Sequence, residues 1–335
     1  MKRFGLIAVL TAFVFTLAGF HVAEAKNYEW KLGTIQSPTA LNGQAIGEFV
    51  GKVDELTGGQ MKIKVGYNSA FGGLKELVPA VAMGSVEMHI EGHNWWDTLD
   101  GNRKIFTFPY TLTSWEHADK FVRSPIWADM VKKLNDKGVH MPFPDPKNPV
   151  LWKRGPTRVI CSKRPIFTVS DLQGLKLRLY ESEMAKRVWK HFGCNITVIA
   201  WAEAYLALKQ GMVEAITSPL NMTYDMKFHE VAPYITDINE FLQWEAMAVN
   251  KAKWDDLPPE IQQAIVEAAD YAAEWSNKRL YDRVELDIQK MLNEGGFYIR
   301  TSTKSFEDAI KPLAKQMEEE GQWQKGLFEQ IQALK

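Results

Sequence analysis

Cysteine is scarce in this sequence, because only Cys161 and Cys194 occur among 335 residues. A chain of this length does not depend on a single disulfide for its core, which excludes the class of small disulfide-stabilised domains. The two residues either pair in an oxidising compartment or pack as buried thiols that behave like small apolar side chains. The sequence leaves both alternatives open.

An excess of charge of one sign is also missing, since the formal net charge at pH 7 is −1. Neither nucleic acid nor an anionic membrane is therefore expected as a partner, and any positive potential must be local. Hydrophobic residues make up 46% and charged residues 24% of the chain, as in ordinary globular proteins. The length gives room for two domains.

The signatures of common enzyme classes are absent as well. The sequence has no GxSxG nucleophile motif, no phosphate loop ending in GK[ST] and no glycine-rich dinucleotide fingerprint. His89, Glu91 and His93 alternate along a predicted strand, where residues on one face are about 6.6 Å apart. Such side chains do not easily converge on one metal ion with bonds of about 2.0–2.1 Å. We therefore expect no metal site, no cofactor and no catalytic residue.

The one long apolar run lies at the N-terminus. Lys2 and Arg3 precede an apolar stretch over residues 5–20, and Ala23-Glu24-Ala25 supplies the small residues of a cleavage site. A membrane anchor would need about 20 apolar residues and a stop-transfer flank. We predict that residues 1–25 are a signal peptide cleaved near Ala25, and that the exported chain is not embedded in a membrane.

The sequence does contain alternating strand and helix patterns. In the first half we expect strands over residues 28–34, 61–67 and 86–91, a helix between residue 42 and Gly58 with apolar positions over 46–53, and helices over residues 74–83 and 114–122. This β-α-β order predicts an open α/β sheet covered by helices. Ligands of such sheets bind beyond the carboxyl ends of the strands. Glu91, followed closely by Asn94, Trp95 and Trp96, is therefore a candidate wall of a binding site.

Two predicted strands in the second half each carry an arginine among apolar residues. Arg158 lies in the segment 157–163, and Arg178 lies in the segment 175–180, where it alternates with leucines at 175, 177 and 179. The guanidinium group is a planar fork of donors that matches a carboxylate in bidentate geometry. The two arginines therefore suggest a carboxylate site, although an arginine on a strand more often pairs with an acid or faces solvent.

Four prolines within residues 142–149 separate the two halves and predict a crossover between domains. After it, helices are expected over residues 182–191 and 202–210, and strands over residues 196–199, 213–216 and 247–250. A long helix over residues 257–294 begins with Pro258 and Pro259 and ends at two glycines. At 1.5 Å per residue it measures roughly 50 Å, so we expect it to lie across both domains.

The order of several motifs resembles the solute-binding subunits of tripartite ATP-independent periplasmic (TRAP) transporters, the DctP-type family. The family pattern R-x-x-x-[ST]-x-[RK]-x-I and D-[LM]-x-G-[LM]-K-[IL]-R stands here as residues 158–166 and 171–178. E-x-[YF]-x-A-L-x-x-G-x-[VI]-[DE] stands as residues 203–214, and L-P-x-x-x-Q-x-x-[IV]-x-x-A-A as residues 257–269. Each piece alone is weak, whereas the ordered set is specific.

The resemblance implies a two-lobed α/β binding protein of the Venus-flytrap type, similar to type II, with a long helix spanning both lobes. Residues 26–153 plus about 245–280 would form lobe I. Residues 154–244 plus about 281–335 would form lobe II. It also implies a ligand in the cleft, closure of the lobes around it, a periplasmic location, and TRAP membrane permease subunits as partners.

The resemblance further assigns site residues. Arg178 stands at the position of the main carboxylate anchor and Arg158 at that of a second contact. Ser218 replaces the family's usual asparagine before Pro219, so Asn221 or a water is a candidate substitute. The remaining candidate ligand-binding residues, drawn from both lobes, are Asn42, Glu91, Asn94, Trp95, Trp96 and Trp201.

We expect a small organic carboxylate as the ligand. Trp95, Trp96 and Trp201 can stack on a flat body, and Glu91 can accept hydrogen bonds from an amine or hydroxyl. These residues favour an aromatic, indole-type or amino-bearing monocarboxylate over the alternatives, a sugar acid or a hydroxy acid. A binding protein that feeds a sensor is another alternative, and a secreted hydrolase is the least favoured.

Overall fold

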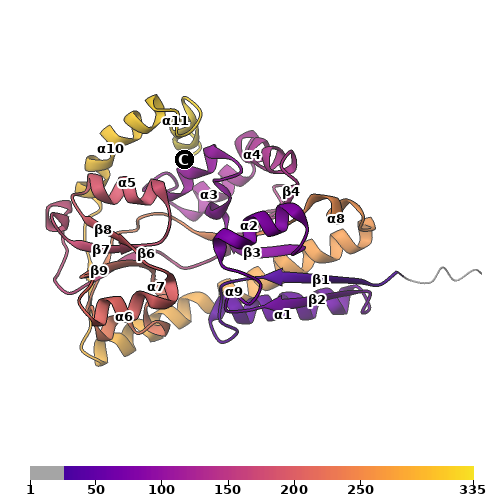
Figure 1. Cartoon of the computed structure of the whole chain (residues 1–335), viewed down its shortest axis with the longest axis horizontal. Coiled ribbons are helices and arrows are strands. Elements are labelled where there is room, and N and C mark those ends of the chain that lie inside the picture. Colours follow the sequence, from indigo (N-terminus) through magenta and orange to yellow (C-terminus); the bar gives the residue numbers. More distant parts are fainter. Residues whose placement is uncertain (1–25) are drawn as a thin grey trace, which may run out of the picture.

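The structure, a computed structural model, describes residues 26–335 and contains two α/β lobes that lie side by side (Figure 1). The predicted signal peptide, residues 1–25, lies outside the described residues. None of the helices within residues 26–335 is long and apolar enough to cross a bilayer.

The sheet of lobe I has the strand order β2-β1-β3-β11-β4, with β5 also paired to β11. Parallel pairing joins β1 to β2 and β3, whereas β11 runs antiparallel to β3, β4 and β5. The strands are β1 (Tyr28–Gly33), β2 (Met61–Gly66), β3 (Met88–Gly92), β4 (Val139–Phe143), β5 (Trp152–Lys153) and β11 (Trp244–Asn250). The accompanying helices are α1 (Leu41–Leu56), α2 (Leu74–Met83), α3 (Trp115–Val122), α4 (Pro125–Asn135) and α8 (Lys251–Asp255).

The sheet of lobe II has the order β12-β10-β6-β9-β7-β8. Strand β6 is antiparallel to both neighbours, and β7 is parallel to β8 and β9. The strands are β6 (Arg158–Ser162), β7 (Lys176–Leu179), β8 (Asn195–Val198), β9 (Ala215–Pro219), β10 (Tyr234–Asp237) and β12 (Phe297–Arg300). The accompanying helices are α5 (Glu183–His191), α6 (Ala204–Lys209) and α7 (Leu220–Asp225). Short 3₁₀ helices cover His93–Trp96, Gly101–Thr107, Val169–Leu172, Trp201–Glu203 and Phe228–Glu230.

The long helix α9 (Pro259–Asn293) runs beneath both lobes (Figure 1). Its first half buries Ile261 and Ile265 against the core of lobe I, which contains the inner face of α1. Its second half buries Leu280 and Ile288 against the core of lobe II. The apolar residues of one helix therefore stabilise two cores, and the prediction of a helix spanning both lobes is confirmed.

The C-terminal helices α10 (Lys304–Glu319) and α11 (Leu327–Gln332) connect the lobes at the side opposite α9 (Figure 1). Helix α10 packs on α5 of lobe II. Helix α11 instead reaches lobe I, where the His117 ring nitrogen lies 2.7 Å from the carbonyl of Ile331 and Gln332 donates to the Thr111 carbonyl at 2.6 Å. The sequence placed all of residues 281–335 in lobe II, whereas these contacts tie the last helix to lobe I.

The two cysteines are free thiols, which decides between the alternatives left open by the sequence. Both are buried, and they belong to different hydrophobic clusters, Cys161 in the cluster between lobe II and α9 and Cys194 in the cluster beside α5. Burial raises the pKa of each thiol to about 12, so both stay protonated at neutral pH. They act as small core residues.

Candidate functional site

Arg178 lies on strand β7, and its side chain contacts the segment that follows β8. The flanking leucines, Leu177 and Leu179, are fully buried in the core on the opposite face of the strand, as the alternation predicted. Arg178 Nε donates a hydrogen bond of 2.8 Å to the carbonyl of Ile199. Its guanidinium carbon lies 5.4 Å from the centre of the Trp201 ring, in a cation–π contact.

The charge of Arg178 has no acidic partner within the described part of the chain, although the residue is only 2% exposed. Burial, together with the positive charge of Arg158, lowers the pKa of Arg178 to about 10. The side chain therefore remains charged at neutral pH. A buried cation that lacks a counter-charge is costly, so this position favours a bound anion.

Arg158 differs from Arg178 in having an acidic partner within the protein. Its guanidinium donates to the Glu240 carboxylate at 3.2 Å, to the Gln243 side-chain oxygen at 2.9 Å and to the Thr217 hydroxyl at 2.8 Å. Trp189 donates to the other oxygen of Glu240 at 2.9 Å. The charge of Arg158 is thus neutralised inside the protein, and its expected role as a free second cation is not what this geometry favours.

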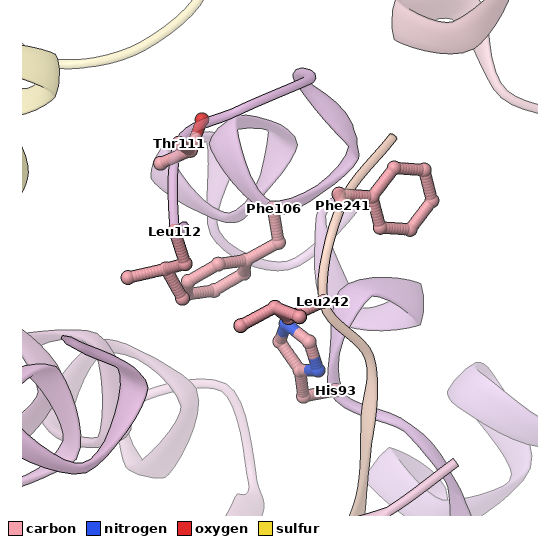
Figure 2. Close-up of a pocket in the computed structure, with 6 residues that line it drawn as sticks. All are labelled: His93, Phe106, Thr111, Leu112, Phe241 and Leu242. Atoms are coloured by element: carbon pink, nitrogen blue, oxygen red, sulfur yellow. The ribbon is translucent and has the colours of Figure 1, made fainter. Parts of the chain in front are cut away.

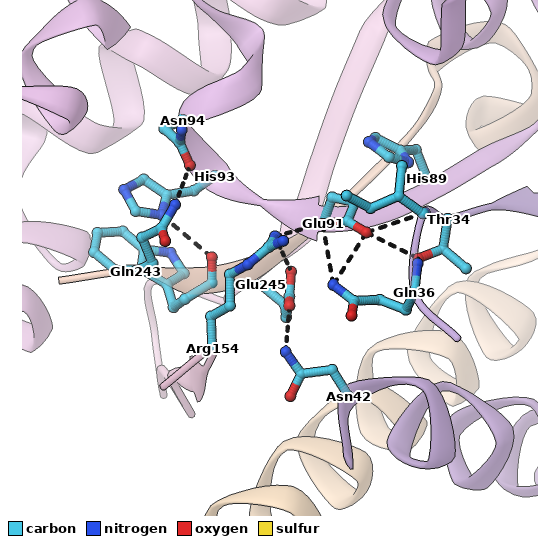
Figure 3. Close-up of polar contacts among 12 residues, drawn as sticks. Thr34, Gln36, Asn42, His89, Glu91, His93, Asn94, Arg154, Gln243 and Glu245 are labelled. Carbon is cyan, nitrogen blue, oxygen red and sulfur yellow. Dashed lines mark hydrogen bonds and ion pairs between the residues drawn. The ribbon is translucent and has the colours of Figure 1, made fainter. Parts of the chain in front are cut away.

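The wall of the site in lobe I is a polar network centred on Arg154 (Figure 3). Arg154 NH1 donates to the carboxylate of Glu91 and lies 3.5 Å from that of Glu245. Glu91 also accepts from the Thr34 hydroxyl at 3.0 Å and from the Gln36 amide at 3.2 Å. Both oxygens of Glu91 are therefore occupied by protein donors, so it orients Arg154 and Gln36 in place of the predicted hydrogen bond to a ligand.

Glu245 lies on β11, next to the strand that carries Glu91. Its carboxylate accepts a hydrogen bond of 2.6 Å from Asn42, at the start of α1. Burial and the charge of Glu91 raise the pKa of Glu245 to about 8, and Arg154 and Asn42 act in the opposite direction. Glu245 is therefore largely protonated at neutral pH while Arg154 keeps its charge, since the carboxylates raise its pKa against the effect of burial.

Three polar side chains converge in front of Gly92, at the carboxyl end of β3. A Cβ atom at Gly92 would lie 2.8 Å from Asn94 Oδ1, 3.1 Å from Arg154 NH1 and 3.3 Å from Trp95 Nε1. Glycine is needed here because any side chain would displace these groups. Trp95 meets Tyr180 of lobe II edge-on, with ring centres 5.2 Å apart, so the cluster reaches from one lobe to the other.

Several buried polar atoms around this cluster have no hydrogen-bond partner within residues 26–335. They include both donors and acceptors. They are Asn42 Oδ1, Asn94 Nδ2, Trp95 Nε1, Arg154 Nε, the Tyr180 hydroxyl and Asn221 Oδ1. Other such atoms, for example Trp127 Nε1, lie in the apolar core. Because a buried polar atom is normally hydrogen-bonded, this set makes the region a candidate place for a polar ligand.

Three other candidate residues, Ser218, Asn221 and Trp96, are less favourably placed for contact with a ligand. The Ser218 hydroxyl is buried and donates to the Pro219 carbonyl at 2.9 Å, so it is occupied within its own strand. Asn221 lies close behind Gly155, where a Cβ would come within 2.5 Å of its Oδ1. Trp96 is fully buried in the hydrophobic core and lines no cleft. The prediction that it forms a pocket wall is not supported.

A small hollow beside the 3₁₀ helices His93–Trp96 and Gly101–Thr107 is too small to hold a ligand (Figure 2). It contains no space large enough for a water molecule. None of the arginines described above lines it. Its walls are His93, Phe106, Thr111, Leu112, Phe241 and Leu242.

No group of three or more histidine, cysteine, aspartate or glutamate side chains within residues 26–335 is arranged to hold a metal ion. His89 Nδ1 donates to the Gly33 carbonyl at 2.8 Å, and His93 stacks on Trp244 with ring centres 3.5 Å apart. Burial lowers the pKa of His93 to about 3, so its ring is neutral. These histidines pack as core residues.

Comparison with known proteins identifies the family of the chain. Residues 32–320 match the model of the DctP family, bacterial extracellular solute-binding protein, family 7. The chain belongs to the DctP family. DctP-family proteins are periplasmic solute-binding subunits of TRAP transporters and not enzymes, which confirms the family and the function class expected from the motifs.

Among curated DctP-family relatives, the chain is 28% identical over 310 residues to the 2,3-diketo-L-gulonate-binding periplasmic protein YiaO of Escherichia coli, with 91% of each chain covered. It is 24% identical over 294 residues to the C4-dicarboxylate-binding periplasmic protein DctP of Rhodobacter capsulatus, with 86% of each covered. A TRAP periplasmic solute-binding protein of Chromohalobacter salexigens, solved with bound D-glucuronate, superposes with a TM-score of 0.83 at 22% identity. That match covers 91% of this chain and 100% of the other, and it confirms the two-lobed α/β fold.

Proposed function

We propose that this DctP-family protein captures a sugar acid in the cleft between its lobes and delivers it to TRAP membrane permease subunits. The observation that carries the proposal is the buried guanidinium of Arg178, which has no carboxylate partner within residues 26–335. A ligand carboxylate would supply the missing charge in bidentate geometry. The indole of Trp201 would cover the guanidinium on one side.

The unpaired polar atoms support a hydroxylated body for the ligand. Arg154 Nε, Asn94 Nδ2 and Trp95 Nε1 are donors, whereas Asn42 Oδ1 and Asn221 Oδ1 are acceptors. A hydroxyl group both donates and accepts, so a chain or ring of hydroxyls can satisfy such a mixed set. A flat aromatic body would leave most of these atoms unpaired, at a cost of about 1–3 kcal/mol each.

The unpaired polar atoms and the burial of Trp96 favour a sugar acid over the aromatic or indole-type ligand favoured from the sequence. Trp96 is a core residue, which leaves Trp95 and Trp201 as the tryptophans near the site. Similar TRAP solute-binding proteins have been solved with bound sugar acids, among them D-glucuronate, β-D-galacturonate and L-galactonate. The alternative ligand class considered from the sequence, a sugar acid, therefore has the better support.

The roles of individual residues are part of the proposal. Arg178 would be the carboxylate anchor, and Arg158 would hold Glu240 and Gln243 in position beside it. Arg154, Asn94 and the remaining unpaired groups would bind hydroxyls. The signal peptide over residues 1–25, with cleavage near Ala25 and export to the periplasm, belongs to the same proposal.

Mass spectrometry of the acid that co-purifies with the protein, followed by calorimetry with that acid, tests the function. Arg178→Ala should abolish measurable binding, whereas Arg123→Ala, at an exposed arginine paired with Asp119, should leave it unchanged. Circular dichroism establishes that both variants are folded. Equal affinity of wild type and Arg178→Ala, or an aromatic acid as the ligand, would overturn the proposal.

A further inference from the structure

The side chain of Gln243 is hydrogen-bonded to both lobes. Gln243 ends the segment 238–243, which leads from β10 of lobe II to β11 of lobe I. Its Oε1 accepts from Arg158 NH1 of lobe II at 2.9 Å. Its Nε2 donates to Asn94 Oδ1 of lobe I at 3.0 Å (Figure 3). All three side chains are buried, so a chain of buried hydrogen bonds runs from one lobe to the other through the Gln243 amide.

The groups at the lobe II end of this chain are held by further contacts. The backbone carbonyl of Gln243 accepts from the Arg154 amide at 3.0 Å, which joins the two segments that connect the lobes. Arg158 is held in turn by the Glu240 carboxylate and the Thr217 hydroxyl. Gln243 therefore has a fixed backbone and a fixed partner in lobe II, and its amino group is held toward lobe I.

The direction of these hydrogen bonds is set by Arg158. A guanidinium has donors and no acceptor, so the side-chain oxygen of Gln243 must face it and the amino group must face Asn94. Asn94 then accepts with Oδ1, which leaves its Nδ2 as the group free to bind another molecule. This Nδ2 is buried and has no hydrogen-bond partner within residues 26–335. An arginine of lobe II thus determines which end of an amide in lobe I is free.

We infer that Gln243 is a positioning residue that makes Asn94 a hydrogen-bond donor toward an oxygen atom of the bound acid. The inference rests on the proposed function, in which Asn94 binds a ligand hydroxyl, and adds how the polarity of that contact is set. It also gives Arg158 an indirect role in binding, exerted through Gln243 and Asn94, although its own charge is paired with Glu240. Without the bond from Gln243, the Asn94 amide is free to turn and to present its oxygen in place of its amino group.

A double-mutant cycle measured by calorimetry tests the inference. The probes are D-glucuronate, D-galacturonate and L-galactonate, and the acid that wild type binds most tightly is used throughout. Gln243→Met should weaken binding about three- to tenfold in wild type but less than about twofold in Asn94→Ala, because Gln243 acts through Asn94. Gln316→Met, which removes an exposed hydrogen bond to Glu320 on α10, is the matched control and should leave the affinity unchanged. Equal losses in both backgrounds would mean that Gln243 acts through Arg158 or the fold, and would overturn the inference.

A second measurement needs no bound acid. In protein with isotope-labelled asparagine, the NMR signal that disappears in Asn94→Ala is assigned to the Asn94 side-chain amide. The double variant Arg158→Met/Glu240→Gln removes both charges of the ion pair in lobe II and should shift this signal, because Arg158 reaches Asn94 through Gln243. An unchanged signal would overturn the inference. If the signal shifts but none of the three acids binds to wild type, the orienting role of Gln243 stands and the sugar-acid function is contradicted.

Discussion

Arg178 and Trp201 form a cation–π pair in lobe II, with the guanidinium carbon 5.4 Å from the indole centre. The indole itself meets Phe228 edge-on at 5.3 Å, so an aromatic ring in the core of lobe II supports the one that covers the arginine. Together with the hydrogen bond from Nε to the Ile199 carbonyl, this fixes the plane of the guanidinium. The proposed carboxylate anchor is thus held in one orientation by contacts within its own lobe.

Arg178→Lys should lose most of the affinity even though it keeps the positive charge. Lysine lacks the planar fork and cannot bind a carboxylate in bidentate geometry while also donating to Ile199. We expect affinity to fall by about 2–4 kcal/mol, approaching that of the alanine variant. Calorimetry checks this, and affinity within threefold of wild type would contradict a geometric role.

Trp201→Leu should weaken binding without unfolding the protein. The cation–π contact with Arg178 is worth roughly 0.5–2 kcal/mol, and the ring is only partly buried. The dissociation constant should rise about 3- to 30-fold, and Trp201→Phe should recover part of the loss. Unchanged affinity in the leucine variant would show that the ring does not support the anchor.

Breaking the Arg158–Glu240 pair should destabilise the fold more than removing both charges. Arg158→Met leaves Glu240 buried and unpaired, and Glu240→Gln does the reverse, each costing about 3–5 kcal/mol. The double variant should recover much of that loss. Urea unfolding of all four proteins measures the coupling, and strictly additive losses would mean that the pair carries no mutual stabilisation.

The free energy of unfolding should depend on pH through the ionisation of Glu245. Its pKa is raised from the ordinary 4.5 to about 8, so the folded protein binds this proton more tightly than the unfolded chain does. The stabilisation is complete below 4.5 and is lost as pH rises through about 8, with a slope of at most about 1.4 kcal/mol per pH unit. Stability of wild type relative to Glu245→Gln, measured from about pH 5 to 9, should therefore decrease. A flat difference would place the Glu245 pKa near its ordinary value.

Reducing agents should not change the melting temperature, because both cysteines are free and buried. Titration with a thiol reagent should detect no rapidly reacting thiol in the native protein and both thiols in denaturant. A thiol count that rises only after reduction would indicate a disulfide.

Much of the fold could be predicted from local pattern. The helix over residues 74–83 has the expected bounds, and Ser114 caps α3 by accepting from the His117 amide at 3.1 Å. Strand β4 was missed because Pro142 lies within it. Proline is tolerated there because β4 is at the end of the sheet order, which is a property of tertiary pairing that the local sequence does not contain.

The site was predicted less completely. Arg178 was found because its position is part of an ordered motif, but Arg154 and Glu245 were overlooked. Glu245 did give a signal, since it is a single acid within the fully buried strand β11. Its partners, Asn42 and Arg154, are 203 and 91 residues away in the chain, so only the folded structure brings the network together.

Strand β11 has a consequence for how the protein can be divided. It is the partner of β3, β4 and β5 in the sheet of lobe I, yet in the chain it follows five of the six strands of lobe II. A fragment ending near residue 155 would lack it, leaving β4 and β5 without their hydrogen-bonding neighbour. Separately expressed halves of this sequence should therefore not yield two folded lobes, and ligand capture depends on the uninterrupted polypeptide.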